Sequence, residues 1–184
     1  MAVLYTKQKI FTNSFKEELF ANSESLPFQE STVWNFNPNS NRVDHNKRKS
    51  KFKFIERNYL PENYTKNILT LVNIYDPKSK DLNLSHTESN LIFYEKGDHF
   101  RELHKDGSLK YKKRLYSAIT LLEYSEDAIG ADLFLQNTDP DDPILVNSNL
   151  KVYETIVFSS STKHLISDLL SGTRVSLISW FGIQ

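Results

Sequence analysis

Apolar and polar residues follow two different periods along the chain, and the change between them falls near residue 82. Before it, apolar side chains recur every three or four residues over 14–20 and 61–74, a spacing that predicts two amphipathic helices. After it, short apolar or alternating segments are separated by Gly, Asp and Pro, which is typical of β-strands joined by turns. The clearest predicted strands are residues 90–94, 117–124, 131–135, 150–158 and 174–181.

Many short strands after a helical N-terminal part favour a mainly β fold with flanking helices, either a sandwich or a jelly roll. We expect a single domain over residues 1–184, with residues 1–80 as helical and loop support and residues 82–184 as the jelly-roll core. The length suits one domain, since domains commonly hold about 100–200 residues.

The polar stretch over residues 23–50 is predicted to be mostly loop, with a short strand near residues 32–36. A basic run, Lys47–Lys53, overlaps a predicted strand over residues 52–55. The simplest interpretation of this run is a solvated edge or loop. The alternative is a contact for an acidic partner or nucleic acid. The overall charge weakens this alternative, because 23 Lys and Arg residues balance 23 Asp and Glu residues.

The composition narrows the chemistry and the location that we expect. The chain contains no cysteine, so disulfides and thiolate metal sites are excluded and any metal must bind His, Asp or Glu. The N-terminus lacks the apolar run of a signal peptide, and no stretch approaches the roughly 18 apolar residues that span a bilayer. We therefore expect a soluble, cytoplasmic protein that does not enter a membrane.

The segment from Tyr94 to Asp106 contains the strongest chemical signal, His104-Lys105-Asp106. Side chains two residues apart on an extended strand point the same way, so the His104 imidazole and the Asp106 carboxylate would converge there. A plain turn is the alternative, because Asp-Gly follows at once. His164 is the candidate third ligand. Two histidines and one carboxylate form the facial triad that leaves positions open on non-haem Fe(II).

Arg174 begins the C-terminal predicted strand, ten residues after His164. If this strand pairs antiparallel with the segment before it, the two residues would take neighbouring positions in one cavity. A buried arginine needs an anion, and its planar fork suits a carboxylate. The alternatives are an exposed charge at Arg174 and a loop histidine at His164.

Together these residues resemble the iron(II)/2-oxoglutarate-dependent dioxygenases, and specifically their prolyl 4-hydroxylase-like branch. That family has Tyr-x-x-Gly-x-x-(Phe/Tyr) leading to His-x-Asp. A Gly-Gly-Glu-like turn follows, then a distal His, and then Gly-x-Arg before a strand that ends in Trp. The resemblance covers residues 88–182, and the matching residues are Tyr94, Gly97, Phe100, His104, Asp106, Gly130, Ala131, Asp132, His164, Gly172, Arg174 and Trp180.

The resemblance implies a double-stranded β-helix, the cupin-like jelly roll, in which His104, Asp106 and His164 bind Fe(II). It also implies that Arg174 pairs with the distal carboxylate of 2-oxoglutarate, and that Tyr94 faces this cosubstrate or lines the pocket. The cofactors implied are Fe(II), 2-oxoglutarate and O₂, with ascorbate as an additional candidate. Because an aspartate occupies the ligand position, no position is vacant for a halide, so hydroxylation is favoured over halogenation.

Three departures from the family pattern concern the loops and the substrate rim more than the metal. One extra residue lies between Phe100 and His104. Ala131 replaces the second glycine of the turn, and Asp132 replaces its glutamate. The strand before the turn ends in residues 123–125, Glu-Tyr-Ser, where the family usually has a Tyr-Leu-Asn-like run.

The connection over residues 105–114 carries five basic residues around Tyr111. It is predicted to form a flap at the mouth of the site, with Lys105, Tyr111 and Arg114 as candidate substrate contacts. A merely soluble loop is the alternative. Trp180 is a further candidate on the substrate side, although core packing is the simpler interpretation.

The predicted function is hydroxylation of an unactivated C–H bond, in a prolyl or other residue of a peptide or protein. Two alternatives stay open: a hydroxylase of a free amino acid or other small molecule, and a non-catalytic jelly-roll binding module. Demethylation of nucleic acid is disfavoured, because it usually needs a second arginine after Arg174 and residues 175–184 contain none. The substrate and the oligomeric state are left open.

Overall fold

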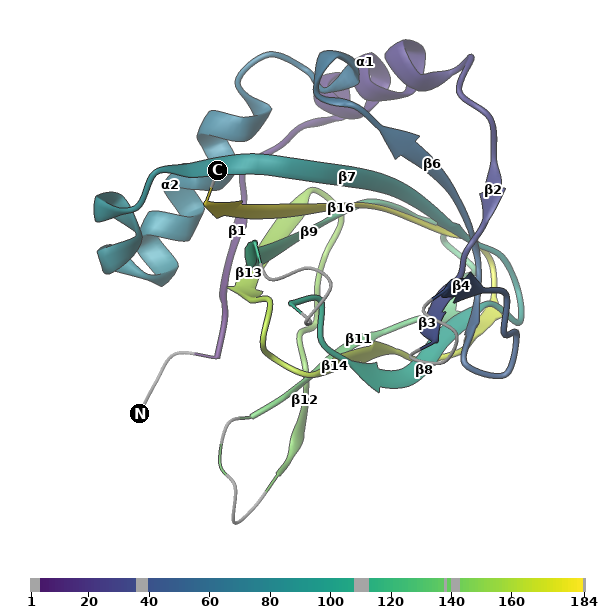
Figure 1. The fold of residues 1–184 in the computed structure, drawn as a ribbon. Coiled ribbons are helices and arrows are strands. Elements are labelled where there is room, and N and C mark those ends of the chain that lie inside the picture. Colours follow the sequence, from purple (N-terminus) through teal and green to yellow (C-terminus); the bar gives the residue numbers. More distant parts are fainter. Residues whose placement is uncertain (1–3, 36–39, 108–112, 138, 140–142, 184) are drawn as a thin grey trace.

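The computed structural model describes residues 4–35, 40–107, 113–137, 139 and 143–183. Its strands form two antiparallel sheets that face each other, and two α-helices cover the outer side of the larger sheet (Figure 1). The prediction of a mainly β jelly roll with flanking helices is confirmed.

The larger sheet has seven strands in the order β1-β13-β9-β16-β7-β6-β2. Among its long central strands, β7 and β9 begin before the predicted strands and end where predicted, and β16 begins where predicted and ends two residues later. The strands of this sheet are β1 Thr6–Lys9, β2 Gln29–Glu30, β6 Lys51–Ile55, β7 Leu84–Tyr94, β9 Arg114–Tyr124, β13 Glu154–Ser159 and β16 Arg174–Ile183.

The smaller sheet has five strands in the order β12-β11-β14-β8-β5, and two further strand pairs, β3–β4 and β10–β15, lie outside both sheets. The strands of the smaller sheet are β5 Arg48–Lys49, β8 His99–His104, β11 Leu133–Gln136, β12 Leu145–Asn147 and β14 His164–Ile166. The two pairs consist of β3 Val33–Asn35, β4 Ser40–Arg42, β10 Ile129–Gly130 and β15 Leu169–Ser171.

Both predicted helices are present, as α1 Asn13–Ser23 and α2 Tyr64–Tyr75, with short 3-10 turns η1 Arg57–Tyr59 and η2 Pro77–Asp81. The second helix begins at Tyr64 rather than at residue 61, because Asn63 has a φ of 67°, outside the helical region. Among the described helices, none has the length and apolar character needed to cross a lipid bilayer.

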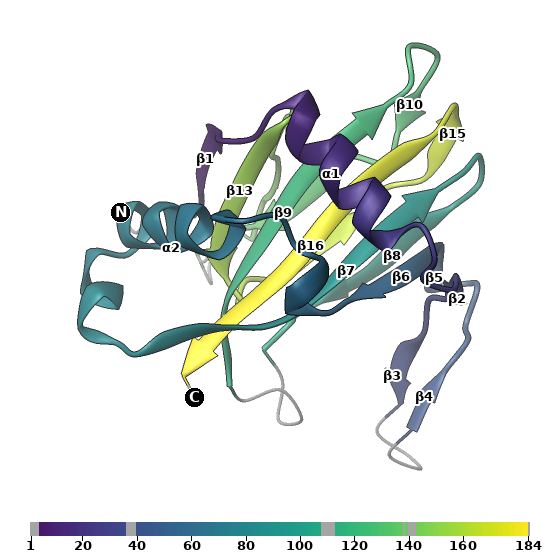
Figure 2. The same cartoon turned by 90° about the horizontal axis from the view of Figure 1, so that it is seen from above.

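Alternation along the central strands creates two separate cores. On β16, Val175, Leu177 and Phe181 face the helices and pack with α1 and α2. Arg174 and Ile178 lie on the opposite side, between the two sheets, where apolar residues of β7, β9, β13, β11 and β14 meet. Figure 2 shows α1 lying across the central strands of the larger sheet. Because a charged residue, Arg174, is buried between the sheets, we look for a functional site in this space.

The first 80 residues contribute strands to both sheets as well as helices. β1, β2 and β6 belong to the larger sheet, and β5 forms the edge of the smaller one. The basic run predicted as a solvated edge or loop forms β5 and most of β6. Its position at an edge places one of its residues, Arg48, beside β8.

The extra residue predicted between Phe100 and His104 is accommodated by a bulge in β8. The backbone N–H groups of Arg101 and Glu102 both donate to the Lys47 carbonyl, at 2.9 and 3.4 Å. On the other side of β8, His164 of β14 pairs with His104, and Ile166 pairs with Phe100. Two residues of β14 therefore span the same length as four residues of β8. The irregularity brings the Phe100 ring onto the His104 ring.

A buried chain of hydrogen bonds connects the larger sheet to α2 on the helix side. The His86 Nε2 lies 2.7 Å from the Ser89 hydroxyl, which bonds to the Ser179 hydroxyl across the β7–β16 pair. The Ser179 hydroxyl in turn lies 2.6 Å from the Tyr64 hydroxyl. These polar groups satisfy one another inside an otherwise apolar layer.

We expect the protein to lose stability as the pH falls from about 6.5 towards 4. Burial, aided by the nearby Arg57, lowers the pKa of His86 from 6.5 to about 4. In the unfolded chain this ring regains its ordinary pKa and takes up a proton first, so acid favours unfolding across this window. Because the ring is partly exposed, we expect its contribution to be on the order of 2 kcal/mol.

Urea unfolding at pH 7 and pH 4.5 measures this effect. The loss of unfolding free energy between the two pH values should be smaller in His86→Gln than in the parent protein. A variant of the exposed His45, His45→Gln, should lose as much as the parent. Equal losses in all three proteins would contradict the assignment to His86.

Candidate metal centre

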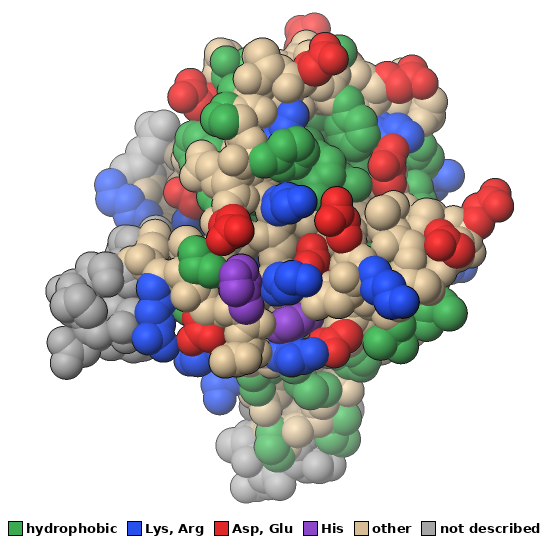
Figure 3. All heavy atoms as spheres, turned by 90° about the vertical axis from the view of Figure 1, so that its right-hand side faces the viewer, with side chains coloured by type: hydrophobic (Ala, Val, Ile, Leu, Met, Phe, Trp, Pro, Cys, Tyr) green, Lys and Arg blue, Asp and Glu red, His purple; other side chains and the backbone are tan. Residues whose placement is uncertain are grey.

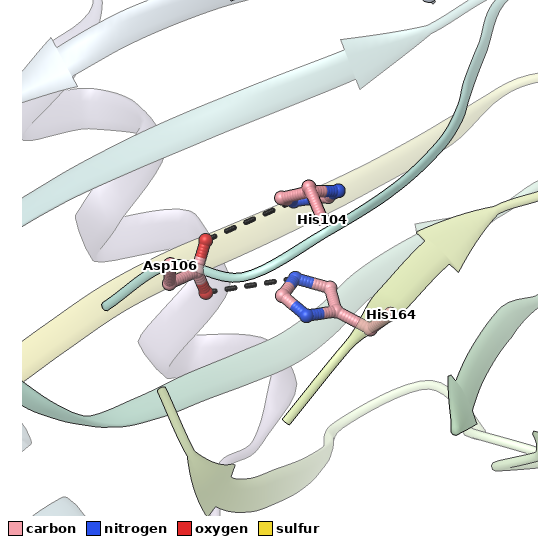
Figure 4. Close-up of side chains that lie close together, drawn as sticks. All are labelled: His104, Asp106 and His164. Carbon is pink, nitrogen blue, oxygen red and sulfur yellow. Dashed lines mark ion pairs between the residues drawn. The ribbon is translucent and has the colours of Figure 1, made fainter. Parts of the chain in front are cut away.

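The structure brings His104, Asp106 and His164 together between the two sheets (Figure 4). One candidate ligand atom from each lies within 4.8 Å of the others. The Asp106 carboxylate lies 3.8 Å from the His104 Nε2 and 3.5 Å from the His164 Nε2. Adjacent ligands at roughly 2.1 Å from one ion are about 3 Å apart, so only a small adjustment would suit a shared metal. Their role as ligands stays a prediction.

The ends of two paired strands supply the cluster. The strand β8 ends at His104, and Asp106 follows two residues later, where the chain bends. His164 lies directly opposite His104 in the β8–β14 pair. The end of one strand and the start of its neighbour therefore supply the two imidazoles, and the bend returns Asp106 to them.

Backbone carbonyls fix the orientation of both imidazoles. The His104 Nδ1 lies 2.9 Å from the Glu102 carbonyl, and the His164 Nδ1 lies 3.0 Å from the Thr162 carbonyl. In a neutral ring that donates from Nδ1, the Nε2 lone pair is available, and both Nε2 atoms face Asp106. The Nε2 lone pairs of His104 and His164 are therefore directed towards the same region beside the Asp106 carboxylate.

Aromatic rings hold the imidazoles on their other sides. Phe100 stacks on His104 with 3.7 Å between ring centroids, and Phe158 meets the His164 ring edge-on at 5.0 Å. The burial that results lowers the pKa of His104, and a charge on His164 would lower it further. The His104 ring is therefore neutral at physiological pH and needs to release no proton before it binds a metal.

Asp106 is buried, and hydrogen bonds hold it in place. The Ser117 hydroxyl donates to its carboxylate at 2.7 Å and also bonds to the Ser160 hydroxyl at 2.9 Å. Burial raises the pKa of Asp106, but His164 and His104, with Ser117 and Trp180, outweigh burial and lower it overall. The Trp180 indole N–H is close enough to contribute, although no hydrogen bond of ordinary geometry joins it to the carboxylate.

Arg174 lies at the start of β16 and is only 3% exposed. Its guanidinium carbon lies 5.4 Å from the centroid of the Tyr94 ring, which belongs to its cross-strand neighbour on β7. Among the described residues, no carboxylate lies within ion-pair distance of Arg174. The interpretation of this residue as an exposed charge is therefore wrong, and its guanidinium is a buried cation that lacks an anion.

The expected pairing of the His164 and Arg174 segments is also wrong. β14 belongs to the smaller sheet and β16 to the larger one, so the two residues lie in facing sheets. Arg174 instead borders a cavity of about 250 Å³ with Leu121, Tyr124 and Leu133. The facing sheets still place both residues on the interior side, because His164 contacts Phe158 of the apolar core there.

Buried polar atoms without partners test whether this interior fits a bound group. Three such atoms lie on interior positions of the sheets: Asn90 Oδ1, Ser176 Oγ and Arg48 Nε. Ser176 lies between Arg174 and Ile178 on one side of β16, and Asn90 is the cross-strand neighbour of Ile178. Polar atoms are rarely buried unsatisfied, so the interior fits a polar ligand beside a metal.

The candidate residues of the flap are only partly described. Tyr111 lies outside the described residues, and Lys105 is exposed beside the metal residues. The Arg114 guanidinium stacks over the Trp180 ring at 4.0 Å and forms an ion pair with Glu88. Trp180 itself is buried and lies close to Asp106, which agrees with both interpretations of it.

Sequence analysis missed three residues of this region: Arg48, Ser117 and the stacking role of Phe100. A signal for Arg48 was present, because Arg48, Ser50 and Phe52 alternate with lysines and so share one face of an extended segment. The lysines on the other face form ion pairs: Lys47 with Glu102, Lys49 with Asp98 and Lys51 with Glu95. Figure 3 shows the side of the molecule that lies on the right in Figure 1, where basic and acidic side chains surround exposed histidine atoms.

Known proteins resemble this chain in fold but not detectably in sequence. No protein-family model matches the chain, and no curated protein sequence matches it. A prolyl-4-hydroxylase from Pseudomonas putida superposes with a TM-score of 0.71 at 16% identity, covering 98% of this chain and 93% of that one.

Two further structures have the same fold. A prolyl hydroxylase from Trichoplax adhaerens, in complex with a peptide fragment of hypoxia inducible factor, has a TM-score of 0.66 at 13% identity. The match covers 97% of this chain and 83% of that one. A viral collagen prolyl hydroxylase from Paramecium Bursaria Chlorella virus-1, in complex with 2-oxoglutarate, has a TM-score of 0.59 at 12% identity, with 99% and 97% covered. The chain thus has the fold of prolyl hydroxylases and 2-oxoglutarate oxygenases.

Proposed function

We propose that this protein is an Fe(II)- and 2-oxoglutarate-dependent dioxygenase that hydroxylates an unactivated C–H bond. One observation carries the proposal: a His-Asp-His cluster and a buried arginine without an anion face the same interior of a jelly roll. The fold that it shares with 2-oxoglutarate oxygenases supports the same conclusion.

In this proposal His104, Asp106 and His164 would hold the metal. Two imidazole nitrogens and one carboxylate oxygen are the donor set of the facial triad, which suits Fe(II) and leaves positions for other ligands. When bound, Fe(II) together with 2-oxoglutarate and O₂ supplies oxidative decarboxylation, which gives succinate, CO₂ and a hydroxylated product. Because Asp106 provides a ligand oxygen, we propose hydroxylation rather than halogenation.

The other residues of the chain would bind, orient and exclude water. Arg174 would pair with the distal carboxylate of 2-oxoglutarate through its planar fork. Tyr94 would form part of the wall beside it. Ser117 holds the Asp106 carboxylate, and the carbonyls of Glu102 and Thr162 hold the imidazoles. The apolar core between the sheets keeps water away from the reacting atoms.

For the substrate we propose a prolyl or other residue of a peptide or protein. The support is the similarity in fold to prolyl hydroxylases, one of which is described in complex with a peptide. A free amino acid or other small molecule is the alternative within the same chemistry. Succinate release stimulated by proline-containing peptides, compared with free amino acids, separates these two substrate classes.

We expect the purified protein, supplied with Fe(II), 2-oxoglutarate and O₂, to release succinate slowly even without a substrate. His104→Ala should reduce this release by more than about 100-fold, because removing residues that merely support a metal ligand already costs about 10–100-fold. The exposed His45 offers a matched control, and His45→Ala should keep the parental rate.

Succinate formation and 2-oxoglutarate consumption, measured together, check this prediction. A parent protein that binds the metal but releases no succinate would support a non-catalytic binding module instead. Equal release from the parent and from His104→Ala would remove His104 from the site.

A further inference from the structure

Arg48 is a second buried arginine beside the candidate metal centre. It lies on β5, opposite Phe100 of β8, and cross-strand neighbours project from the same face of a sheet. Its guanidinium carbon lies 4.6 Å from the centroid of the Phe100 ring, and that ring stacks on His104. Arg48, Phe100 and His104 therefore form one continuous stack that leads from the sheet edge to the metal residues.

The hydrogen-bonding capacity of Arg48 is largely unused. Its Nη1 donates to the Thr32 carbonyl at 3.3 Å, and its Nε is buried without a partner. No carboxylate of the described residues lies within ion-pair distance of its guanidinium. The alternating lysines on the other face of this segment, Lys47, Lys49 and Lys51, each have an acidic partner. Arg48 thus differs from its neighbours in lacking an anion.

A buried cation of this kind is costly without a counter-charge. Burial lowers the pKa of Arg48, and the nearby Tyr94 and Asp106 offset only part of that effect. An arginine that served only to support the fold would be expected to have its donors satisfied. An unpartnered Nε on an inward-facing arginine instead indicates that an external acceptor completes the site.

The missing acceptor is not the distal carboxylate of 2-oxoglutarate, for which Arg174 is available. Arg174 lies on the larger sheet beside Tyr124 and Asp132, whereas Arg48 lies on the smaller sheet beside Phe100. Tyr94 contacts Arg174, and it is near enough to Arg48 to act on its charge as well. The interior therefore contains two separate cationic positions, one of which adjoins the metal residues on the side of His104.

We propose that Arg48 binds a carboxylate group of the substrate, so that the molecule that is hydroxylated is acidic close to the reacting C–H bond. This inference rests on the proposed function. A carboxylate matches the planar fork of arginine with two parallel hydrogen bonds, and one of them would satisfy the orphaned Nε. The α-carboxylate of a free amino acid and the side-chain carboxylate of a peptide offer the same chemistry.

The Arg48 Nε–H resonance reports directly on this interaction. The experiment uses the full chain loaded with Zn(II), which is redox-inert, and saturated with 2-oxoglutarate. Acetate is the minimal carboxylate probe, and acetamide is its neutral match. The resonance is assigned by its absence in Arg48→Gln. We expect acetate to shift it saturably and acetamide to leave it in place, with the Arg174 Nε–H resonance unchanged.

Three results would overturn the inference. The Arg48 resonance could fail to respond to acetate, it could respond equally to acetamide, or 2-oxoglutarate alone could move it fully. The last result would assign Arg48 to the cosubstrate. Failure of the proposed function looks different, because 2-oxoglutarate would then leave the Arg174 resonance unmoved whatever acetate does at Arg48.

Matched acid and amide probes identify the source of the carboxylate. Free L-proline is compared with L-prolinamide, and a doubly capped glutamate is compared with a doubly capped glutamine, each by titration of the same protein. The acid of at least one pair should bind about tenfold tighter or more, as expected for a charge-assisted pair. The pair with the larger difference distinguishes a free amino acid from an acidic side chain.

Variants connect the preference to Arg48. Arg48→Gln should remove the difference between acid and amide while the dissociation constant of 2-oxoglutarate stays within about twofold of the parental value. Lys49→Gln, which removes the same charge from the next residue, should keep the preference. Equal binding of acids and amides by the parent protein, or a preference that survives Arg48→Gln, would refute the proposal.

Discussion

Replacing Asp106 with alanine is expected to raise the dissociation constant for a divalent metal by at least about 100-fold while the metal-free protein stays folded. The variant would lose the only carboxylate of the cluster and with it the negative charge that offsets the dication. The two imidazoles would remain, held by the Glu102 and Thr162 carbonyls. Two neutral ligands alone bind such an ion weakly.

The metal-free variant should be less stable than the parent and still folded. Alanine removes a desolvation cost, but it also removes the Ser117 hydrogen bond and the interactions with His164 and His104 that keep the pKa of Asp106 low. Ser117 keeps its bond to the Ser160 hydroxyl in the variant. The loss of metal binding can therefore be separated from a loss of folding.

Thermal unfolding with and without Mn(II) checks this expectation. At a metal concentration of about 100 times its dissociation constant, the parent should gain about 2.7 kcal/mol. Asp106→Ala should gain almost nothing, while Asp168→Ala, which removes a carboxylate paired with Arg101 at the surface, should gain as much as the parent. Equal metal stabilisation of the Asp106→Ala protein would place the metal elsewhere.

The parts of the fold that could be predicted from the sequence are those set by local periodicity. In β16, alternation separates Val175 and Leu177 from Arg174 and Ile178, and this pattern alone indicates a strand with two different faces. The spacing within α2 likewise predicts a helix. The observed helix begins later than the predicted one, because Asn63 has a left-handed backbone conformation. Both signals lie within a few consecutive residues.

The pairing of distant strands could not be predicted in the same way. Nothing in residues 164–174 tells that β14 and β16 join different sheets, because sheet membership depends on partners far along the chain. The position of Asp106 depends on Ser117, which lies 11 residues further along the chain and bonds to the carboxylate. Ser117 in turn bonds to Ser160, a further 43 residues along the chain. Such long-range contacts leave no periodic trace in the sequence.

Arg48 shows why the candidate site was predicted only in part. His104, Asp106, His164 and Arg174 could be found because each matches a residue type that the chemistry needs. Arg48 lies in a basic run, and a run of charges usually marks a solvated surface. Its burial depends on the β5–β8 pair and on the Phe100 ring, which the sequence places about 50 residues away. The alternation of Arg48, Ser50 and Phe52 with lysines indicates which face Arg48 shares, but its burial depends on tertiary contacts.

Replacing Arg174 with methionine should have opposite effects with and without the cosubstrate. Without 2-oxoglutarate, the variant should be as stable as the parent or more stable, because burial disfavours the Arg174 charge. Tyr94, Asp132 and Tyr124 offset burial only in part, and no carboxylate of the described residues forms an ion pair with Arg174. With 2-oxoglutarate, the parent would gain two charge-assisted hydrogen bonds that the variant lacks. Together these are worth about 3 kcal/mol, which corresponds to a rise of roughly 100-fold in the 2-oxoglutarate requirement.

The metal dissociation constant should not change in Arg174→Met, because the three candidate ligands come from other segments. Thermal unfolding and uncoupled succinate release, each titrated with 2-oxoglutarate, measure the two effects. Arg174→Lys keeps the charge but not the planar fork, so its requirement should lie between those of the parent and Arg174→Met. If 2-oxoglutarate stabilised Arg174→Met as much as the parent, its distal carboxylate would bind elsewhere. A ligand-binding residue is expected to behave in this way. The buried guanidinium of Arg174 would lower the stability of the protein without 2-oxoglutarate and raise its affinity for 2-oxoglutarate.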